Sequence, residues 1–290
     1  MGETAVSAIV LFHVGPTLPQ HVKDCVTKIR QFSDSIPVYV IGNHHGDPSA
    51  VWVDSSSSPF DEVRLRLEGL QYFQGDGNPM WRLAAFRLFY IQQFMEDRDL
   101  TDVLHFDNDV LLFEDPDKII ETCFAIHGRG GIGRCAITAH SDTHVVFGMS
   151  YFPTQLSVSR LTNPLYEQMS RNWHALASEH GGYPSEMAIL SKYAELSFLP
   201  IIPCGSSRYA ADFEAFKSVF DPAAYGQFLS GTDAEKQPGY MTDAQEAGKL
   251  MIQKRLRVFM EARMPYIAFD GTKVKLNSLH IHSKNTGAYL

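Results

Sequence analysis

Two aspartates, Asp107 and Asp109, interrupt an otherwise mainly apolar stretch at residues 103–113. A strand of this composition is expected in the middle of a sheet, where ionised carboxylates are costly unless a positive charge lies between them. Because successive side chains of a strand point to opposite faces, the two aspartates should share one face and Asn108 the other. The spacing predicts that both carboxylates bind one hard divalent cation, Mg²⁺ or Mn²⁺. The alternative is a polar strand end whose acids cap the next turn.

Near the end of the chain, His280, His282 and Lys284 are spaced two residues apart, which places them on one face of an expected strand. Imidazole can bind a divalent cation, and an ammonium group can neutralise phosphate oxygens. Taken alone, the pattern is more typical of an exposed edge strand with polar residues outward. Together with Asp107 and Asp109, it predicts a site for a metal-bound phosphate compound.

Arg87 lies within an expected helix at residues 79–95, where its neighbours three and four residues away are apolar. A guanidinium group stays charged when it is buried and then needs an anionic partner. Asp107 is the expected partner, because the helix leads directly into its strand. The alternative is an arginine whose charged end reaches solvent along its own stem.

Two further carboxylates are candidates for catalysis. Glu186 falls in the first turn of a helix expected at 185–196, where the helix dipole favours an acid whatever its role. It can also act as a general base or bind an acceptor. The second candidate, Asp233, ends the segment 220–233, whose polar residues could hold a sugar or form an ordinary loop: Tyr225, Gln227, Thr232 and Asp233.

The first part of the chain predicts alternating strands and helices. A strand at 9–14, a helix at 18–32 and a strand at 36–41 form a βαβ unit, which is typical of doubly wound α/β folds. The elements expected next are a strand at 51–54, helices at 60–73 and 79–95, the strand that contains Asp107, and a helix from the Asp115 cap and Pro116 to His127.

The second half alternates less regularly. Asp270 and Gly271 give a strong hairpin signal between two apolar runs. No shift in composition marks a domain boundary. The expected elements are a strand at 144–151, helices at 164–178 and 185–196, a strand at 198–202, and hairpin strands at 265–269 and 273–282.

Composition narrows the class of protein. The 290 residues carry a net charge of -8 and are 44% hydrophobic, which favours a large core and argues against nucleic acid or an anionic membrane as partner. The first residues lack a basic region, and their apolar run is too short to span a bilayer. The four cysteines are scattered and no N-glycosylation sequon occurs, so a cytoplasmic protein without a membrane segment is expected.

The βαβ opening, the Arg87 helix before Asp107-Asn108-Asp109, and His280-Ile-His-Ser-Lys284 together resemble a GT-A type glycosyltransferase. The layout is similar to the glycogenin and lipopolysaccharide galactosyltransferase group. This resemblance implies a Rossmann-like mixed sheet flanked by helices. It also implies hexosyl or pentosyl transfer from a nucleoside-diphosphate sugar, with UDP favoured, to a hydroxyl of a carbohydrate or other acceptor. Mn²⁺ or Mg²⁺ would bridge the diphosphate.

The resemblance also implies roles for individual residues. Asp107 and Asp109 bind the metal together with His282 or His280, and Lys284 contacts the diphosphate. The chain departs from the group in having two histidines, at a shorter distance from the lysine. The residues implied to border the nucleotide and donor are Phe12, His13, Val14, Gly15, Arg87, Asp107 and Asn108.

The resemblance further implies a single domain of residues 1–290, in which residues 1–115 bind the nucleotide sugar. The part at 116–290 would face the acceptor and carry the terminal metal- and diphosphate-binding strand. If transfer inverts the sugar configuration, Glu186 or Asp233 should take the acceptor proton. If configuration is retained, no such base is obligatory.

Two other functions fit parts of the pattern. Residues 107–111 match the motif of haloacid dehalogenase type phosphatases, in which Asp107 would be the nucleophile. Those enzymes usually carry this strand near the amino terminus together with a later acidic motif, and the sequence has neither. The second alternative is a non-catalytic module that binds a nucleotide or a carbohydrate.

Overall fold

The computed structural model describes residues 6–46, 48–70, 72, 79–128, 132–181, 184–203, 207–230 and 245–290. Thr232 and Asp233, which the sequence suggested as substrate-binding residues, lie outside these ranges.

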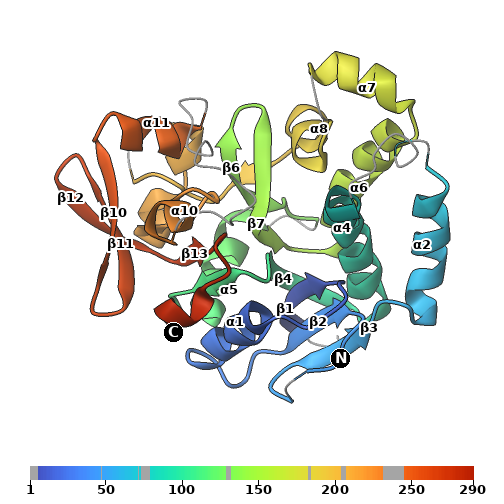
Figure 1. The fold of residues 1–290 in the computed structure, drawn as a ribbon, viewed down its shortest axis with the longest axis horizontal. Coiled ribbons are helices and arrows are strands. Elements are labelled where there is room, and N and C mark those ends of the chain that lie inside the picture. Colours follow the sequence, from blue (N-terminus) through green and yellow to red (C-terminus); the bar gives the residue numbers. More distant parts are fainter. Residues whose placement is uncertain are drawn as a thin grey trace.

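A seven-stranded mixed sheet forms the centre of the molecule, in the order β3-β2-β1-β4-β7-β6-β8 (Figure 1). Strands β3, β2, β1 and β4 run parallel, whereas β7 runs antiparallel to both β4 and β6. The parallel part is the expected βαβ opening. The bounds are β1 Val6–His13, β2 Val38–Gly42, β3 Val51–Asp54, β4 Leu100–Phe106, β6 Ala136–Ser141, β7 His144–Phe152 and β8 Ser197–Phe198.

Helices cover both faces of this sheet. This is seen in β1, whose successive side chains are buried on opposite sides of the sheet. Ala8 and Val10 pack into a cluster with residues of α4, α6 and α8, and Ile9 and Leu11 pack with residues of α1 and α5. The expected α/β fold with a mixed sheet flanked by helices is therefore confirmed. These helices are α1 Gln20–Arg30, α4 Pro79–Asp97, α5 Pro116–Cys123, α6 Gln155–Met169 and α8 Glu186–Tyr193.

The remaining described helices are shorter and lie around this core. They are α2 Asp61–Glu68, α7 Trp173–His180, α9 Phe213–Phe216, α10 Tyr225–Ser230 and α11 Glu246–Ile252. Single turns of other helix types occur at Ser58–Phe60, Phe124–Gly128, Arg208–Ala210 and Thr286–Tyr289.

Two smaller sheets complete the fold. The first has the order β10-β11-β12-β9, and the second pairs β13 with β5. The predicted turn at Asp270 and Gly271 is confirmed, since both residues have positive φ, 42° and 85°. The bounds are β5 Val110–Leu112, β9 Ser218–Val219, β10 Leu256–Glu261, β11 Met264–Phe269, β12 Thr272–Leu276 and β13 Ser278–His280.

The strand before the paired aspartates ends earlier than predicted. β4 stops at Phe106, and the amide of Val110 donates to the carbonyl of Asp107 at 2.9 Å, so residues 107–109 form a turn. The chain then enters β5, which belongs to another sheet. The prediction that strand alternation orients Asp107 and Asp109 is therefore wrong, because a turn sets their directions.

The predicted strand through Lys284 is also wrong. The run 273–282 divides between β12 and β13, and β13 ends at His280. Beyond it, Lys284 donates its amide to the carbonyl of Ile281 at 2.9 Å, and its φ of 60° bends the chain. The alternative of an exposed edge strand is wrong too, since all three residues of β13 are buried.

Several boundaries in the second half differ from prediction. The strand at 144–151 and the helix at 185–196 are confirmed, but the antiparallel partner β6 was not foreseen. The predicted helix at 164–178 is two helices, because Asn172 begins α7 by accepting the amides of His174 and Ala175. The helix after Asp115 ends as an α-helix at Cys123 and continues for one wider turn, and the strand predicted at 198–202 is reduced to β8.

Candidate active site

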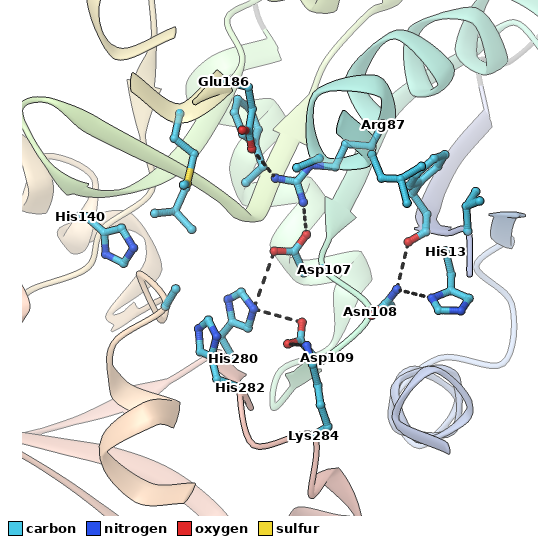
Figure 2. A pocket seen from close by; sticks show the side chains of 18 residues that line it. His13, Arg87, Asp107, Asn108, Asp109, His140, Glu186, His280, His282 and Lys284 are labelled. Atoms are coloured by element: carbon cyan, nitrogen blue, oxygen red, sulfur yellow. Dashed lines mark hydrogen bonds and ion pairs between the residues drawn. The ribbon is translucent and has the colours of Figure 1, made fainter. Parts of the chain in front are cut away.

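A pocket of about 280 Å³ opens where β1 and β4 end, and it brings together side chains from distant parts of the sequence (Figure 2). In open α/β sheets, ligands bind at the carboxyl ends of the strands. The site residues suggested by the sequence that line this pocket are Phe12, His13, Val14, Arg87, Asp107, Asn108, Asp109, Glu186, His280, His282 and Lys284.

Asp109, His280 and His282 form a group that could hold a metal ion. One ligand atom from each lies within 4.8 Å of the others. The Nε2 atom of His280 is 3.0 Å from Oδ1 of Asp109, and the two imidazole rings stack with their centroids 4.1 Å apart. A carboxylate and two imidazoles suit Mn²⁺ better than Mg²⁺, because Mg²⁺ binds almost entirely through oxygen ligands.

The charges around Asp109 keep it ionised although only 2% of the residue is exposed. Burial alone would raise the pKa of its carboxyl group, but His280 and the ammonium of Lys284 hold that pKa well below its usual value. For His280, burial alone would lower the pKa of the imidazole. The charges of Asp109 and Asp107 outweigh burial, so the pKa of His280 is raised. The cluster therefore presents an ionised carboxylate to any cation in the pocket.

Asp107 connects this cluster to Arg87. One of its oxygens forms an ion pair with the guanidinium of Arg87, and the other lies 3.7 Å from Nε2 of His280. The side chain of Arg87 is only 12% exposed, so the expected pairing with Asp107 is confirmed and the solvent-reaching alternative is wrong. Arg87 also lies 3.5 Å from Oε1 of Glu186, so it bridges two carboxylates.

Glu186 enters the pocket from the first turn of α8. The preceding Ser185 caps this helix by accepting the amide of Ala188. Glu186 is 2% exposed, and burial raises its pKa against the opposing effect of Arg87. Within the described part of the chain its Oε2 atom has no hydrogen-bond partner. A buried acceptor without a partner is costly, so this oxygen is available for a hydrogen bond from a group that enters the pocket.

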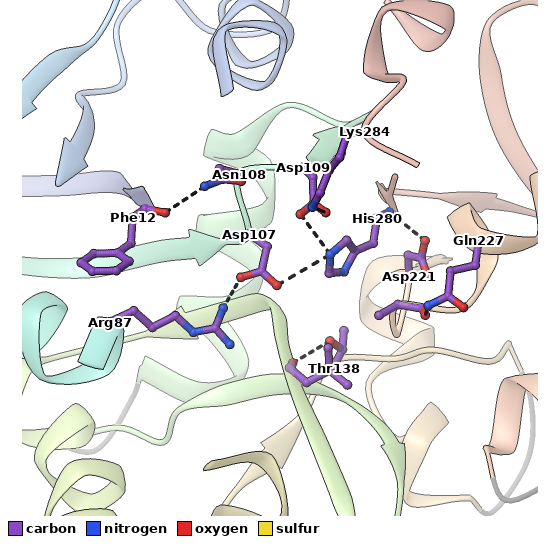
Figure 3. Close-up of polar contacts among 12 residues, drawn as sticks. Phe12, Arg87, Asp107, Asn108, Asp109, Thr138, Asp221, Gln227, His280 and Lys284 are labelled. Carbon is purple, nitrogen blue, oxygen red and sulfur yellow. Dashed lines mark hydrogen bonds and ion pairs between the residues drawn. The ribbon is translucent and has the colours of Figure 1, made fainter. Parts of the chain in front are cut away.

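On the other side of the pocket, Asn108 joins the aspartate turn to the end of β1. Its side-chain amide nitrogen donates to the carbonyl of Phe12 at 3.0 Å (Figure 3) and lies 3.0 Å from Nδ1 of His13 (Figure 2). Asn108 thus points away from Asp107 and Asp109, which is the direction expected from the sequence, although a turn and not strand alternation sets it. Gly15 does not line the pocket, but its amide donates to the side chain of Asn43 at 3.1 Å, which fixes the turn after β1.

The backbone of His280 is held by the buried carboxylate of Asp221. Oδ2 of Asp221 accepts the amides of His280 at 2.8 Å and Gly226 at 2.7 Å (Figure 3), and Oδ1 accepts two more amides of the same loop. Two glycines leave room for His280. A Cβ at Gly226 would lie 2.2 Å from its carbonyl oxygen, and a Cβ at Gly148 would lie 2.8 Å from its Nδ1.

Two suggested substrate residues have structural roles instead. The hydroxyl of Tyr225 donates to the carbonyl of Ile201. The side-chain amide of Gln227 donates from Nε2 to the backbone carbonyl of Ala223 at 2.6 Å. Both are buried and neither lines the pocket, so the suggestion that they hold a sugar is wrong. The pocket residues that the sequence did not indicate are Leu83, Ala84, His140, Val146, Phe147, Met187 and Ala223.

No protein-family model matches the chain, and no curated protein matches its sequence. Searching solved structures gives a mouse xyloside xylosyltransferase, with 9% identity and a TM-score of 0.44, over 64% of this chain and 81% of that one. A glycosyltransferase involved in the glycosylation of the major capsid of PBCV-1 gives 12% identity and a TM-score of 0.34, over 65% of this chain and 76% of that one. The glycosyltransferase GlyE of Streptococcus pneumoniae gives 11% and 0.38, over 78% and 48%.

These similarities are low in sequence identity and in TM-score. The chemistry of this chain is therefore inferred from the side chains that line the pocket. In the described ranges, no helix has the length and apolar character needed to cross a membrane. The geometry itself defines the site: an acid–imidazole group at the end of a central strand, with a buried arginine and a second buried acid beside it.

Proposed function

We propose that the protein is a metal-dependent glycosyltransferase of the GT-A type, which moves a sugar from a nucleoside-diphosphate sugar to an acceptor hydroxyl. The observation that carries the proposal is the meeting of Asp107 and Asp109 with His280, His282 and Lys284 in one pocket. The two aspartates and the three basic residues are about 170 residues apart in the sequence. If the aspartates needed only a positive partner for their charge, a nearby residue of the chain could provide it.

Asp109, His280 and His282 would hold the divalent cation, with Asp107 completing the set. When bound, the cation supplies positive charge to the diphosphate as the bond to the sugar breaks. The ammonium of Lys284, which contacts Asp109, lies beside the same position and adds a second positive charge. Mn²⁺ is proposed over Mg²⁺, because the group includes two imidazoles.

The nucleoside would lie toward the end of β1. A second cavity, of about 330 Å³, shares Phe12, Val14 and Leu83 with the first, and it would offer space for a base and a ribose beside the first pocket. In this proposal residues 1–115 provide the nucleotide side and residues 116–290 the acceptor side. A uridine nucleotide is favoured, and hexose and pentose donors are both retained.

The donor sugar would lie beside the ion pair of Arg87 and Glu186. The free oxygen of Glu186 can accept a hydrogen bond from a hydroxyl, and its raised pKa brings it closer to the range of a general base. If transfer inverts the configuration, we propose Glu186 as the base, with Asp233 as the second candidate. The buried free thiols of Cys25, Cys123 and Cys135 agree with a reducing, cytoplasmic setting.

A thermal-shift panel tests this proposal. UDP, GDP, ADP and their sugar derivatives are each added with and without Mn²⁺, because a ligand that binds the native form raises its melting temperature. We expect one nucleoside diphosphate to raise Tm by several degrees with Mn²⁺ and by much less without it. A panel in which Mn²⁺ makes no difference to any nucleotide would contradict the proposal.

Two further measurements separate the alternatives. Release of phosphate from p-nitrophenyl phosphate that is lost in Asp107→Asn would favour a phosphatase. Binding of a sugar nucleotide with Mn²⁺ but without release of the nucleoside diphosphate, with or without acceptors, would favour a non-catalytic module.

A further inference from the structure

His140 lies at the end of the pocket opposite His13, with Asp107 and His280 between them (Figure 2). It belongs to β6, whose pairing with β7 shifts register between Ala139 and Ser141. Such irregularities redirect individual side chains and are frequent next to active sites. His140 occupies this shift, so its position in the pocket follows from the local break in the ladder.

The imidazole of His140 is a neutral hydrogen-bonding group. Burial, followed by the charges of His280 and His144, lowers its pKa to about 3. Its Nδ1 atom is buried and has no hydrogen-bond partner within the described ranges. A neutral imidazole has one donor and one acceptor nitrogen, and a base with so low a pKa removes protons poorly at neutral pH. His140 is therefore suited to binding a hydroxyl rather than to taking its proton.

Apolar side chains line the same pocket as His140. They include Val146, Met187 and Ala223, and Val146 pairs with Thr138 across the β6–β7 hairpin, two residues before His140. The two lining cations, Arg87 and Lys284, are paired with Asp107 and Asp109. His140, Val146, Met187 and Ala223 themselves offer no positive charge to an anionic acceptor, whereas a sugar ring has an apolar face and hydroxyl groups that such side chains can contact.

We propose that His140, Val146, Met187 and Ala223 form the acceptor subsite, and that the acceptor is a neutral sugar with a hydroxyl hydrogen-bonded to His140. This inference rests on the proposed function. It follows from the order of groups along the pocket: the nucleotide end at His13, the metal group in the middle, and this end left for the incoming hydroxyl.

The test compares His140→Ala and His140→Gln with a control, His174→Ala, at an exposed position of α7. The probes are UDP-glucose, UDP-galactose and UDP-xylose with Mn²⁺, and the acceptors are methyl glycosides of glucose, galactose and xylose. UDP release is measured with and without acceptor. Glutamine keeps both a donor and an acceptor atom, so it should restore most of what alanine removes.

We expect His140→Ala to raise the KM for the acceptor by about tenfold or more, as one lost hydrogen bond of this kind would do. The Kd for UDP and the acceptor-free hydrolysis should stay within about twofold. His140→Gln should fall between native and alanine, and His174→Ala should match the native protein.

Three outcomes would overturn the inference. They are an unchanged acceptor KM in His140→Ala, an equal loss of UDP affinity in that variant, and stimulation of UDP release by none of the neutral glycosides. If the native protein fails to bind UDP with Mn²⁺, the proposed function fails as well. If it binds UDP and one of the three outcomes occurs, only the acceptor assignment is wrong.

Discussion

The two walls of the pocket are built in opposite ways. The wall that carries Asp109 and His280 is tied by charged hydrogen bonds, and the backbone of His280 is anchored by the buried carboxylate of Asp221. The wall that carries His140 belongs to the irregular part of the β6–β7 hairpin and faces the pocket with apolar neighbours. The first wall has fixed geometry, whereas the second has few polar constraints.

This difference indicates that the first wall determines metal and nucleotide binding and the second wall determines which acceptor is selected. A metal site needs ligand atoms fixed to within a fraction of an ångström, and the partners behind the ligands provide that precision. A subsite that selects among sugars can change by single substitutions without disturbing the metal. Substitutions that alter or displace a metal ligand should therefore weaken binding of every nucleotide, and substitutions of the side chains around His140 should change only the acceptor.

The largest effect is expected from Asp109→Asn, which keeps the shape of the side chain and removes its charge. We expect binding of UDP in the presence of Mn²⁺ to weaken by about a hundredfold or more, because a primary ligand and the partner of two cations are lost. Isothermal titration with UDP and Mn²⁺ checks this. The control is Asp142→Asn, at an exposed position beyond β6. Equal affinities of Asp109→Asn and the native protein would remove Asp109 from the metal site.

Gly148→Ala perturbs the wall that carries His280 by size alone, although Gly148 itself lies in β7 of the opposite hairpin. The added Cβ would lie 2.8 Å from Nδ1 of His280, closer than real Cβ contacts, so the imidazole must move. We expect UDP affinity with Mn²⁺ to fall by about tenfold, since displaced ligands bind metal poorly. In the control Gly69→Ala, the nearest atoms to the new Cβ are 3.8 Å away, and affinity should be unchanged. A Gly148→Ala variant that binds normally would show that this wall is adaptable.

Lys284→Ala should have a smaller effect, because the side chain is 43% exposed and lies at the edge of the metal group. We expect UDP to bind about fivefold more weakly while UMP, which lacks the second phosphate, is affected less. Titrations with both nucleotides in Mn²⁺ check the difference. An exposed lysine at the start of α5 gives the control Lys118→Ala. Equal losses for UDP and UMP would place Lys284 away from the diphosphate.

The first wall was recognisable from the sequence because its residue types are unusual in their surroundings. Acids at the end of an apolar run and closely spaced histidines indicate chemistry whatever the local geometry. The predicted geometry was nevertheless wrong, since Asp107 and Asp109 lie in a turn and β13 ends at His280. Whether a strand continues depends on which neighbour it pairs with, and β5 and β13 pair across more than 160 residues.

The second wall gave little signal. His140 lies in β6, which pairs with β7. The sequence predicted β7 but not β6, because the turn at 142–143 between them contains no glycine, asparagine or proline. Tyr225 and Gln227 show the converse problem. Their polar groups suggested sugar binding, but they bond to backbone carbonyls in the interior. A single sequence cannot distinguish a polar group satisfied inside the fold from one that faces a ligand.

The smallest effect at neutral pH is expected from His105→Gln, which sharpens the comparison through a second buried neutral histidine. His105 lies in β4 and donates from Nδ1 to the carbonyl of Val10 at 2.8 Å. Burial, with the charge of Arg87, lowers its pKa to about 4. Unlike His140 it does not line the pocket, so its substitution should leave acceptor KM unchanged.

The pH dependence of stability should reveal His105 instead. Between its ordinary pKa of about 6.5 and its lowered native value, the unfolded chain binds a proton that the native chain does not, so the free energy of unfolding falls as the solution becomes more acidic. The loss from this group should reach about 2 kcal/mol at about pH 5. Urea unfolding at neutral and acidic pH should therefore show a weaker acid loss in His105→Gln than in the native protein. Equal losses would mean that His105 gains its proton in the native fold, and the strand leading into the metal wall would then carry a charge that the present structure does not accommodate.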